Sequence, residues 1–259
     1  MQEVEFPRIY CINLKSSPHR KERMETRFAH HGLTEAVTFI DAVSKESPLV
    51  DFYAQDKSCS HQESNYCSKC RGGLACYASH LKAIRQFLQD GGDIGFICED
   101  DILLHNNFVG KYVKIIRNLS EKVPLITFCY MMNGYDGCHW VGIYPDKQNL
   151  MTIDSVNTWG AQMYLLTKDY ALEVLEYYDK PIKYIDGESG YPEAIIRQSK
   201  GYMTYPPLVI EDGIDSDRDP GDLEYHHHHF RYWGYENYSA SEKEHISPLA
   251  KQQVVSLLN

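Results

Sequence analysis

The chain has 259 residues and carries 26 lysines and arginines against 36 aspartates and glutamates, a formal charge of −10. At this length a chain can bury a substantial core, and its 43% apolar content excludes an intrinsically disordered or fibrous protein. The acidic balance, without a basic stripe, argues against nucleic-acid binding, which depends on lysine and arginine contacts to phosphates.

The first part of the chain predicts two strands that flank a helix. Residues 8–14 are mostly apolar, which is typical of a short buried strand. Ser17 and Pro18 suit the start of a helix, because proline is favoured at the first helical position, and Gly32 marks its end. Residues 37–43 predict the second strand.

A polar segment without periodicity follows at residues 44–72, and we interpret it as a long loop or Cys-rich insertion. A structural zinc ion held by Cys59, Cys67, Cys70 and Cys76 is one interpretation, although the spacing contains one C-x-x-C pair rather than two. Disulfides and free thiols are the alternatives. The insertion is also a candidate acceptor-side or oligomer element.

The middle of the chain alternates helices and strands. Apolar residues recur at alternating threes and fours through residues 73–89, which predicts an amphipathic helix closed by Gly91 and Gly92. Similar patterns predict strands at 94–98, 125–132 and 159–166 and helices at 108–119, 168–178 and 192–199. This alternation is typical of an α/β fold with a mostly parallel central sheet and helices on both faces.

The last third of the chain is rich in loops. Beyond Pro206 and Pro207 the sequence turns polar and irregular, and a closing helix is predicted at residues 249–258. Without an internal repeat or a convincing linker, we expect a single domain over residues 1–259, with an irregular segment at 211–259. The chain has no secretory signal and no run of about 18 apolar residues, so we expect a soluble, cytoplasmic protein with no membrane span.

Three consecutive acids end the predicted strand at 94–98. Glu99, Asp100 and Asp101 lie where open parallel sheets bind ligands, beyond the carboxyl ends of the strands. Their repulsion and desolvation are costly unless a cation neutralises them, and oxygen ligands suit Mg²⁺ or Mn²⁺. Because alternate residues of an extended segment share a face, we expect Glu99 and Asp101 to face the cation and Asp100 to point elsewhere. Solvated acids at a strand end are the alternative.

Three motifs in order along the chain resemble glycosyltransferase family 25. They are residues 9–15 with Pro18 and Arg20, residues 76–82, and residues 96–101. The family includes bacterial lipooligosaccharide galactosyltransferases and enzymes that galactosylate hydroxylysine in collagen. The resemblance implies a GT-A (Rossmann-like) fold and transfer of galactose or glucose from a UDP-sugar to a saccharide or hydroxylysine acceptor. It also implies a Mn²⁺ or Mg²⁺ ion between protein carboxylates and the UDP diphosphate.

The resemblance assigns roles to individual residues. Asp101 matches a direct metal ligand, and Glu99 would approach the metal shell or the ribose. For Ser79 and His80, packing or capping against the acidic turn is the alternative to nucleotide binding. The candidates for cofactor binding are Asn13, Leu14, Arg20, Ser79, His80, Glu99 and Asp100.

An inverting reaction, which the resemblance implies, needs a carboxylate that takes the proton of the acceptor hydroxyl. Asp186 matches a family aspartate and is the first candidate for this base, with Glu188 as the alternative and capping as the structural explanation of either. One residue of a four-histidine run is a candidate third metal ligand, represented here by His227 and His228. The acids at 211–217 lie in a segment that the resemblance places over the donor, or form a solvated loop.

Two other classes of function stay open at the level of the sequence. The first is a catalytically inactive protein that binds a nucleotide sugar. The second is an interaction protein organised by zinc at the cysteine cluster.

Overall fold

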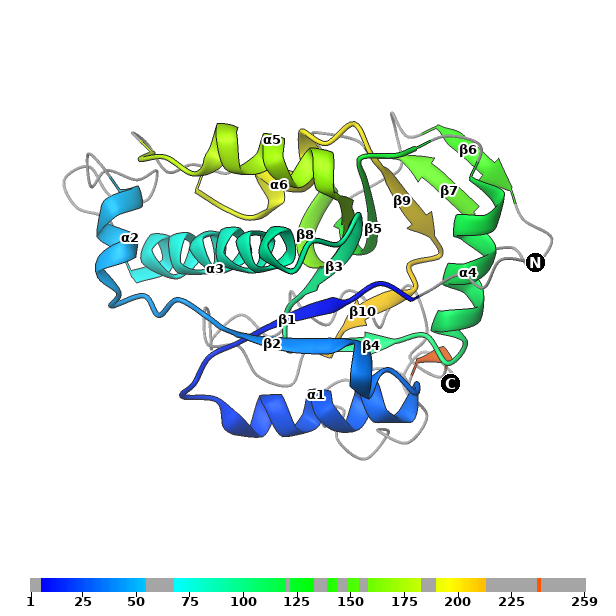
Figure 1. Ribbon diagram of the computed structural model, residues 1–259, viewed down its shortest axis with the longest axis horizontal. Helices are drawn as coiled ribbons and strands as arrows, with labels where there is room; N and C mark the ends of the chain where they lie inside the picture. Colours follow the sequence, from blue (N-terminus) through cyan, green and yellow to red (C-terminus); the bar gives the residue numbers. More distant parts are fainter. Residues whose placement is uncertain are drawn as a thin grey trace, which may run out of the picture.

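The computed structural model describes residues 6–54, 68–119, 122–132, 139–143, 149–153, 158–182, 190–212 and 237–238. Within these ranges an eight-stranded sheet carries helices on both faces (Figure 1). The strands of this sheet are β1 (Ile9–Asn13), β2 (Val37–Asp41), β3 (Ile94–Cys98), β5 (Leu125–Met132), β6 (Trp140–Ile143), β7 (Asn149–Thr152), β8 (Thr158–Thr167) and β9 (Tyr202–Tyr205). A separate two-stranded sheet pairs β4 (Ile102–Leu104) with β10 (Val209–Glu211).

The strand order in the large sheet is β2-β1-β3-β8-β5-β9-β7-β6. The β1/β2, β1/β3 and β5/β9 pairs are parallel, and the β3/β8, β5/β8, β7/β9 and β6/β7 pairs are antiparallel. Six strands therefore point one way, and only β7 and β8 run against them. The predicted α/β class with a mostly parallel central sheet is confirmed, and it is consistent with the GT-A-like fold that the family resemblance implies.

Six α-helices and one 3₁₀ turn are described, and simple sequence rules explain several of their ends. Pro18 occupies a first-turn position of the first helix, and that helix is followed by Gly32 at φ +67°, a conformation that favours glycine. The side chain of Thr167 caps the fifth helix by accepting a hydrogen bond from the backbone N–H of Tyr170 at 3.3 Å. The elements are α1 (Pro18–His30), η1 (Thr34–Ala36), α2 (Pro48–Tyr53), α3 (Ser68–Asp90), α4 (Phe108–Asn118), α5 (Lys168–Tyr178) and α6 (Glu193–Arg197).

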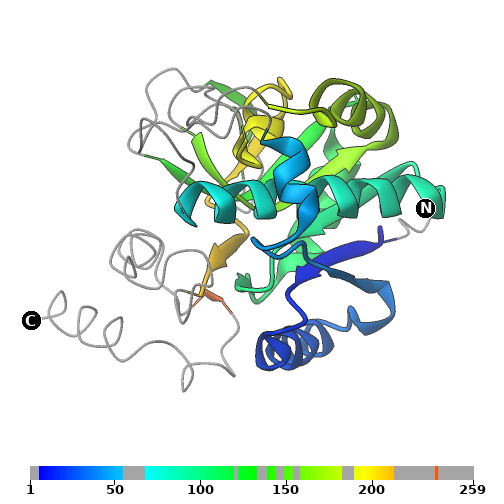
Figure 2. The same ribbon diagram turned by 90° about the vertical axis from the view of Figure 1, so that its left-hand side faces the viewer.

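The core has two layers, one on each face of the large sheet. Because side chains alternate along a strand, Tyr10 and Ile12 of β1 pack with α2, α3, α5 and α6, whereas Ile9 and Cys11 pack with α1 and α4. Figure 2 shows this arrangement, with α1 on one side of the strands and α3 and α5 on the other. The small β4/β10 sheet belongs to the α1 and α4 side.

Several elements were absent from the sequence prediction. The segment 44–72, predicted as a loop, contains α2 and the first residues of α3. Strands β4, β6, β7, β9 and β10 have only three or four residues each, which is too short for a clear periodic pattern. Residues 209–211 form β10 where an irregular chain was expected, because they pair with β4.

Some predictions are not tested by the fold. The closing helix at 249–258 lies outside the described residues, and the single domain over 1–259 stays a prediction. Among the described residues, no helix combines the length and the apolar character that crossing a membrane requires.

Candidate functional site

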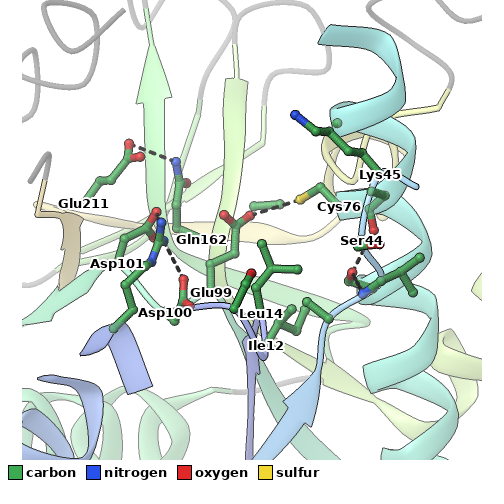
Figure 3. A pocket seen from close by; sticks show the side chains of 18 of the residues that line it. Ile12, Leu14, Ser44, Lys45, Cys76, Glu99, Asp100, Asp101, Gln162 and Glu211 are labelled. Carbon is green, nitrogen blue, oxygen red and sulfur yellow. Dashed lines mark hydrogen bonds and ion pairs between the residues drawn. The ribbon is translucent and has the colours of Figure 1, made fainter. Parts of the chain in front are cut away.

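A pocket of about 380 Å³ opens at the carboxyl ends of β1, β2 and β3 (Figure 3). This is the edge at which open parallel sheets bind their ligands. Its walls come from the chain after each of these strands, from one side of α3, and from β8, α6 and β10. The lining residues that the sequence predicted for the site are Leu14, Arg20, Ser79, Glu99, Asp100 and Asp101.

Arg20 joins the acidic turn to helix α1. Its Nη2 atom lies 2.5 Å from Asp100 Oδ1 and 3.0 Å from Asp101 Oδ2, and all three side chains are buried. Asn13, the last residue of β1, donates its Nδ2 hydrogen to Asp100 Oδ2 at 2.6 Å. Three of the predicted cofactor-binding residues thus meet at the strand end, because Asn13 and Arg20 both contact Asp100. Asn13 is not one of the residues that line the pocket.

The expected orientation of Asp100 is wrong. Asp100 does not point away from Asp101, because both carboxylates contact the same guanidinium and both line the pocket. Glu99 turns in another direction, toward α3 (Figure 3). The physical reason is that β3 ends at Cys98 and the chain bends at residues 100 and 101, so the alternation of an extended strand no longer applies.

The electrostatics of the acidic turn favour a cation. Burial raises the pKa of Asp100 and raises that of Asp101 well above its ordinary value, since the charged form loses its hydration there. The Arg20 guanidinium lowers both pKa values, whereas Glu211 and Glu99 raise that of Asp101 further.

One atom of the turn also lacks a hydrogen-bond partner within the described part of the chain. Asp101 Oδ1 is buried and accepts no hydrogen bond there. The carboxylates of Asp100, Glu99 and Glu211 around Asp101 carry more negative charge than the single guanidinium of Arg20 balances. A donor set of carboxylate oxygens therefore fits a hard divalent cation such as Mg²⁺ or Mn²⁺.

Glu99 contacts two side chains of α3. Its Oε1 atom lies 3.3 Å from His80 Nε2 and accepts a hydrogen bond from the Cys76 thiol at 3.7 Å. The other ring nitrogen of His80, Nδ1, lies 3.0 Å from the hydroxyl oxygen of Tyr164. His80 is fully buried behind Glu99, so it contacts the acidic turn, as the packing alternative expected.

Ser79 links α3 to the chain after β2. Its hydroxyl accepts a hydrogen bond from the Val43 backbone N–H at 2.8 Å and donates one to the Ala75 carbonyl at 2.7 Å. Ser79 also lines the pocket, but its hydroxyl is committed to these two backbone groups. The structural alternative for Ser79 is thus supported by its hydrogen bonds.

Two polar residues of the pocket come from the C-terminal half of the chain. Gln162 of β8 lies beside the acidic turn, because its carbonyl accepts a hydrogen bond from the Glu99 backbone N–H at 2.9 Å. Its side-chain Nε2 donates to Glu211 Oε2 at 3.4 Å. The sequence analysis treated Glu211 only as part of an acidic segment and did not mention Gln162. Nothing in the sequence indicated that β8 runs antiparallel beside β3, which is what places Gln162 there.

A buried ion pair between Arg27 and Asp212 lies directly after Glu211 in the chain. Arg27 of α1 directs its Nη1 to Asp212 Oδ2 at 2.8 Å and to the Ile102 carbonyl at 2.9 Å. The backbone N–H of Asp212 in turn donates to the Asp101 carbonyl at 2.6 Å. Helix α1, the acidic turn and β10 are therefore connected directly through these groups.

Several predicted residues are not brought into this site by the described structure. The candidate bases Asp186 and Glu188 and the candidate ligands His227 and His228 lie outside the described residues, as do Cys59 and Cys67.

Cys70 and Cys76, two of the four cysteines in the predicted zinc site, lie on different sides of α3. Cys70 is buried in the core, whereas Cys76 faces the pocket. Six residues along an α-helix separate two positions by about 9 Å of rise and turn them to different sides.

The family model described as "Glycosyltransferase family 25 (LPS biosynthesis protein)" matches residues 6–187, which is more than half of the chain. No curated protein matches the chain. One similar solved structure is described as the crystal structure of a glycosyltransferase involved in the glycosylation of the major capsid of PBCV-1. It is 11% identical over 76% of this chain and 92% of that chain, with a TM-score of 0.31, a likeness too low to carry an argument.

Proposed function

Since this chain belongs to glycosyltransferase family 25, we propose that it moves a hexose from a UDP-sugar to a hydroxyl acceptor in a reaction that depends on Mn²⁺ or Mg²⁺. Membership of the family gives glycosyl transfer as the class of reaction. The proposed hexose is galactose or glucose, and the proposed acceptor is a saccharide or a hydroxylysine side chain.

The observation that supports this proposal most is the acidic turn inside the pocket. Glu99, Asp100 and Asp101 all line a pocket beyond the carboxyl ends of three parallel strands. Two of these acids are buried, with only partial charge compensation from Arg20. A divalent cation bound to a diphosphate would supply the missing positive charge.

In this proposal Asp101 holds the cation, Glu99 joins it when its side chain turns away from Cys76 and His80, and His227 or His228 supplies a further ligand. A bound divalent cation stabilises, as a Lewis acid, the negative charge that develops on the diphosphate when it leaves the sugar. Arg20 fixes the orientation of Asp100 and Asp101 through its two ion pairs. These ion pairs hold the two carboxylates in one orientation at the pocket, which favours productive binding of the donor.

The remaining walls of the pocket suit the other parts of a nucleotide sugar. Ile12, Leu14 and Ala161 offer apolar surface to the uracil and ribose, and Lys45 brings a positive charge to the same pocket. A pocket of a few hundred cubic ångströms with apolar walls and a few polar groups is typical of small-molecule sites.

The proposed base is Asp186, with Glu188 as the alternative. In an inverting transfer the acceptor oxygen attacks the anomeric carbon, its proton passes to the base, and UDP leaves. Glu193 supports this assignment, because it begins α6 and lines the pocket. Asp186 precedes Glu193 by seven residues, which span at most about 25 Å, so the segment can reach the acceptor side of the pocket.

Measuring the release of UDP from UDP-galactose and UDP-glucose tests the proposal. We expect release with Mn²⁺ and its loss in EDTA, and we expect Asp101→Asn and Glu99→Gln to lower turnover by about 10²–10³-fold, as removal of one group that stabilises transition-state charge does. Glu46→Gln is the matched control, because Glu46 also lines the pocket but is exposed and outside the acidic turn.

The outcomes separate the parts of the proposal. Unchanged turnover in EDTA and in both acidic-turn variants would overturn the role of the metal. Binding of UDP without transfer to any saccharide or hydroxylysine acceptor would instead favour a catalytically inactive protein. Full activity of both Asp186→Asn and Glu188→Gln would exclude these residues as the base.

A further inference from the structure

Three side chains of different chemistry converge at the α3 wall of the pocket. Cys76 supplies a thiol, His80 an imidazole nitrogen and Glu99 a carboxylate oxygen, and these three atoms lie within 4.8 Å of one another. Cys76 and His80 are four residues apart on α3, so they lie on the same side of the helix. Glu99, which follows β3, contacts both side chains, and Figure 3 shows its contact with Cys76.

The spacing of these atoms matches the edges of a tetrahedral zinc site. With Zn–S of about 2.3 Å and Zn–N and Zn–O of about 2.1 Å, a tetrahedron has S···O and N···O edges of about 3.6 and 3.4 Å. The corresponding distances here are 3.7 Å from Cys76 Sγ to Glu99 Oε1 and 3.3 Å from His80 Nε2 to the same oxygen. Two of the three edges therefore match those of a zinc site, and the third pair, Cys76 Sγ and His80 Nε2, lies within 4.8 Å.

The imidazole is already oriented as a metal ligand. His80 Nδ1 lies 3.0 Å from the Tyr164 hydroxyl, and the two rings stack with an interplanar angle of 13°. Binding of an ion requires the neutral ring with its proton on Nδ1, which then donates to the Tyr164 hydroxyl while the lone pair of Nε2 binds the ion. Metal-bound histidines are commonly held in this way by a partner on the other ring nitrogen.

This donor set selects a different ion from the acidic turn. Thiolate and imidazole favour Zn²⁺, whereas the carboxylates of Asp100 and Asp101 favour Mg²⁺ or Mn²⁺. Cys76 and Glu99 both line the pocket, so an ion and a water molecule as fourth ligand can reach the site. Three protein ligands with one open position are a common arrangement for zinc.

We propose that Cys76, His80 and Glu99 form a binding site for Zn²⁺ or a similar thiophilic divalent cation. On binding, the Cys76 thiol releases its proton to solvent and forms a sulfur–metal bond. The bound ion engages Glu99, which the proposed reaction uses at the acidic turn. Zinc therefore inhibits transfer by withdrawing this carboxylate, and this consequence alone rests on the proposed function.

Cobalt(II) titration of the EDTA-treated, reduced protein tests the site without any activity assay. We expect the thiolate-to-cobalt charge-transfer absorption of a single thiolate, abolished by one equivalent of Zn²⁺ and retained with one equivalent of Mn²⁺, which binds thiolate more weakly than cobalt or zinc does. Cys76→Ser is expected to remove this absorption. Cys67→Ser is the matched control and is expected to keep it, because Cys67 belongs to the C-x-x-C pair and not to this cluster.

A conservative variant at a residue that does not bind the metal tests the site by a change in metal affinity rather than by loss of binding. Tyr164→Phe retains the ring but removes the hydroxyl that holds His80, so we expect the absorption to persist with metal affinity lowered about 10–100-fold. Circular dichroism of each variant, compared with the wild type, shows that loss of binding does not reflect unfolding.

The outcomes either support or overturn the site. No thiolate absorption in the wild type, or the same absorption in a folded Cys76→Ser protein, would overturn it. Loss in Cys67→Ser with retention in Cys76→Ser would assign the metal to the C-x-x-C pair instead. The proposed function has its own test: it fails if metal-stripped protein supplied with Mn²⁺ releases no UDP. That result would not change the outcome of the cobalt titration.

Discussion

Replacing Arg27 by methionine is expected to destabilise the protein strongly, although Arg27 does not line the pocket. Arg27 is 1% exposed and its partner Asp212 is fully buried, with 2.8 Å between Nη1 and Oδ2. Methionine keeps much of the apolar volume of the side chain but removes the charge and the hydrogen bonds of the guanidinium, among them those to Asp212 and to the Ile102 carbonyl. The variant therefore leaves a buried carboxylate whose main compensating charge is gone.

The magnitude follows from the burial of this pair. Removing one partner of a buried ion pair costs about 3–5 kcal/mol, because the remaining charge stays desolvated. Arg23 Nε lies 3.4 Å from the same Asp212 oxygen and retains part of the compensation, so we expect a value near the lower end of this range. For a chain of this size, each kcal/mol corresponds to a fall in Tm of about 2–4 °C.

Urea unfolding followed by circular dichroism measures this free energy. Glu25→Gln is the control, because Glu25 forms an exposed ion pair with Lys21 at 3.8 Å, worth at most about 0.5 kcal/mol. In the double variant Arg27→Met/Asp212→Leu the uncompensated charge is absent. Its cost is therefore expected to be smaller than the sum of the two single costs.

Two results would refute this reasoning. One is a destabilisation by Arg27→Met no larger than that of Glu25→Gln. The other is strict additivity in the double variant, since additivity would mean that Arg27 and Asp212 do not interact across α1 and β10.

Two further variants test the packing of Gly95 against Phe87 and the contribution of neutral His105 to stability. Gly95→Ala is expected to destabilise the protein by about 1–3 kcal/mol in urea unfolding, because the added Cβ would lie 2.7 Å from the ring of Phe87; an unchanged midpoint would contradict the tight contact. Burial lowers the pKa of His105 to about 4, and its Nδ1 accepts a hydrogen bond from the Asn107 backbone N–H at 3.0 Å. The folded pKa is below the ordinary value of about 6.5, so the stability that neutral His105 contributes is complete above pH 6.5 and is lost as the pH falls toward 4. The free energy of unfolding should therefore fall less steeply over this interval in His105→Asn than in the wild type, and identical slopes would exclude His105 as a contributor.

Much of the local structure was predictable because its causes lie within a few residues. The helix at 168–178 has the predicted bounds, since Thr167 caps it and its apolar residues repeat with helical spacing. The strand at 94–98 was predicted from its apolar run, and the acids after it indicated the position of the pocket. These features depend on residue type and short-range order alone.

The composition of the site was only partly predictable. Glu211 and Gln162 reach the pocket because β10 pairs with β4 and β8 runs antiparallel beside β3, and both are long-range pairings. Cys76 was discussed as a member of a cysteine cluster and as the first residue of the motif at 76–82, although its position four residues before His80 already placed both on one side of a helix. That spacing was the signal that could have found their shared contact with Glu99.

The sequence by itself determined the α/β class, most of the long elements, the family and the place of the acidic turn, because periodicity, capping and motif order are local properties of a chain. The tertiary structure alone decided which side chains surround that turn. Asp100 joins Asp101 on Arg20, Glu99 turns to Cys76 and His80, and β10 brings Glu211. These contacts depend on how distant strands pair to bury both faces of one sheet, and no short stretch of sequence contains that information.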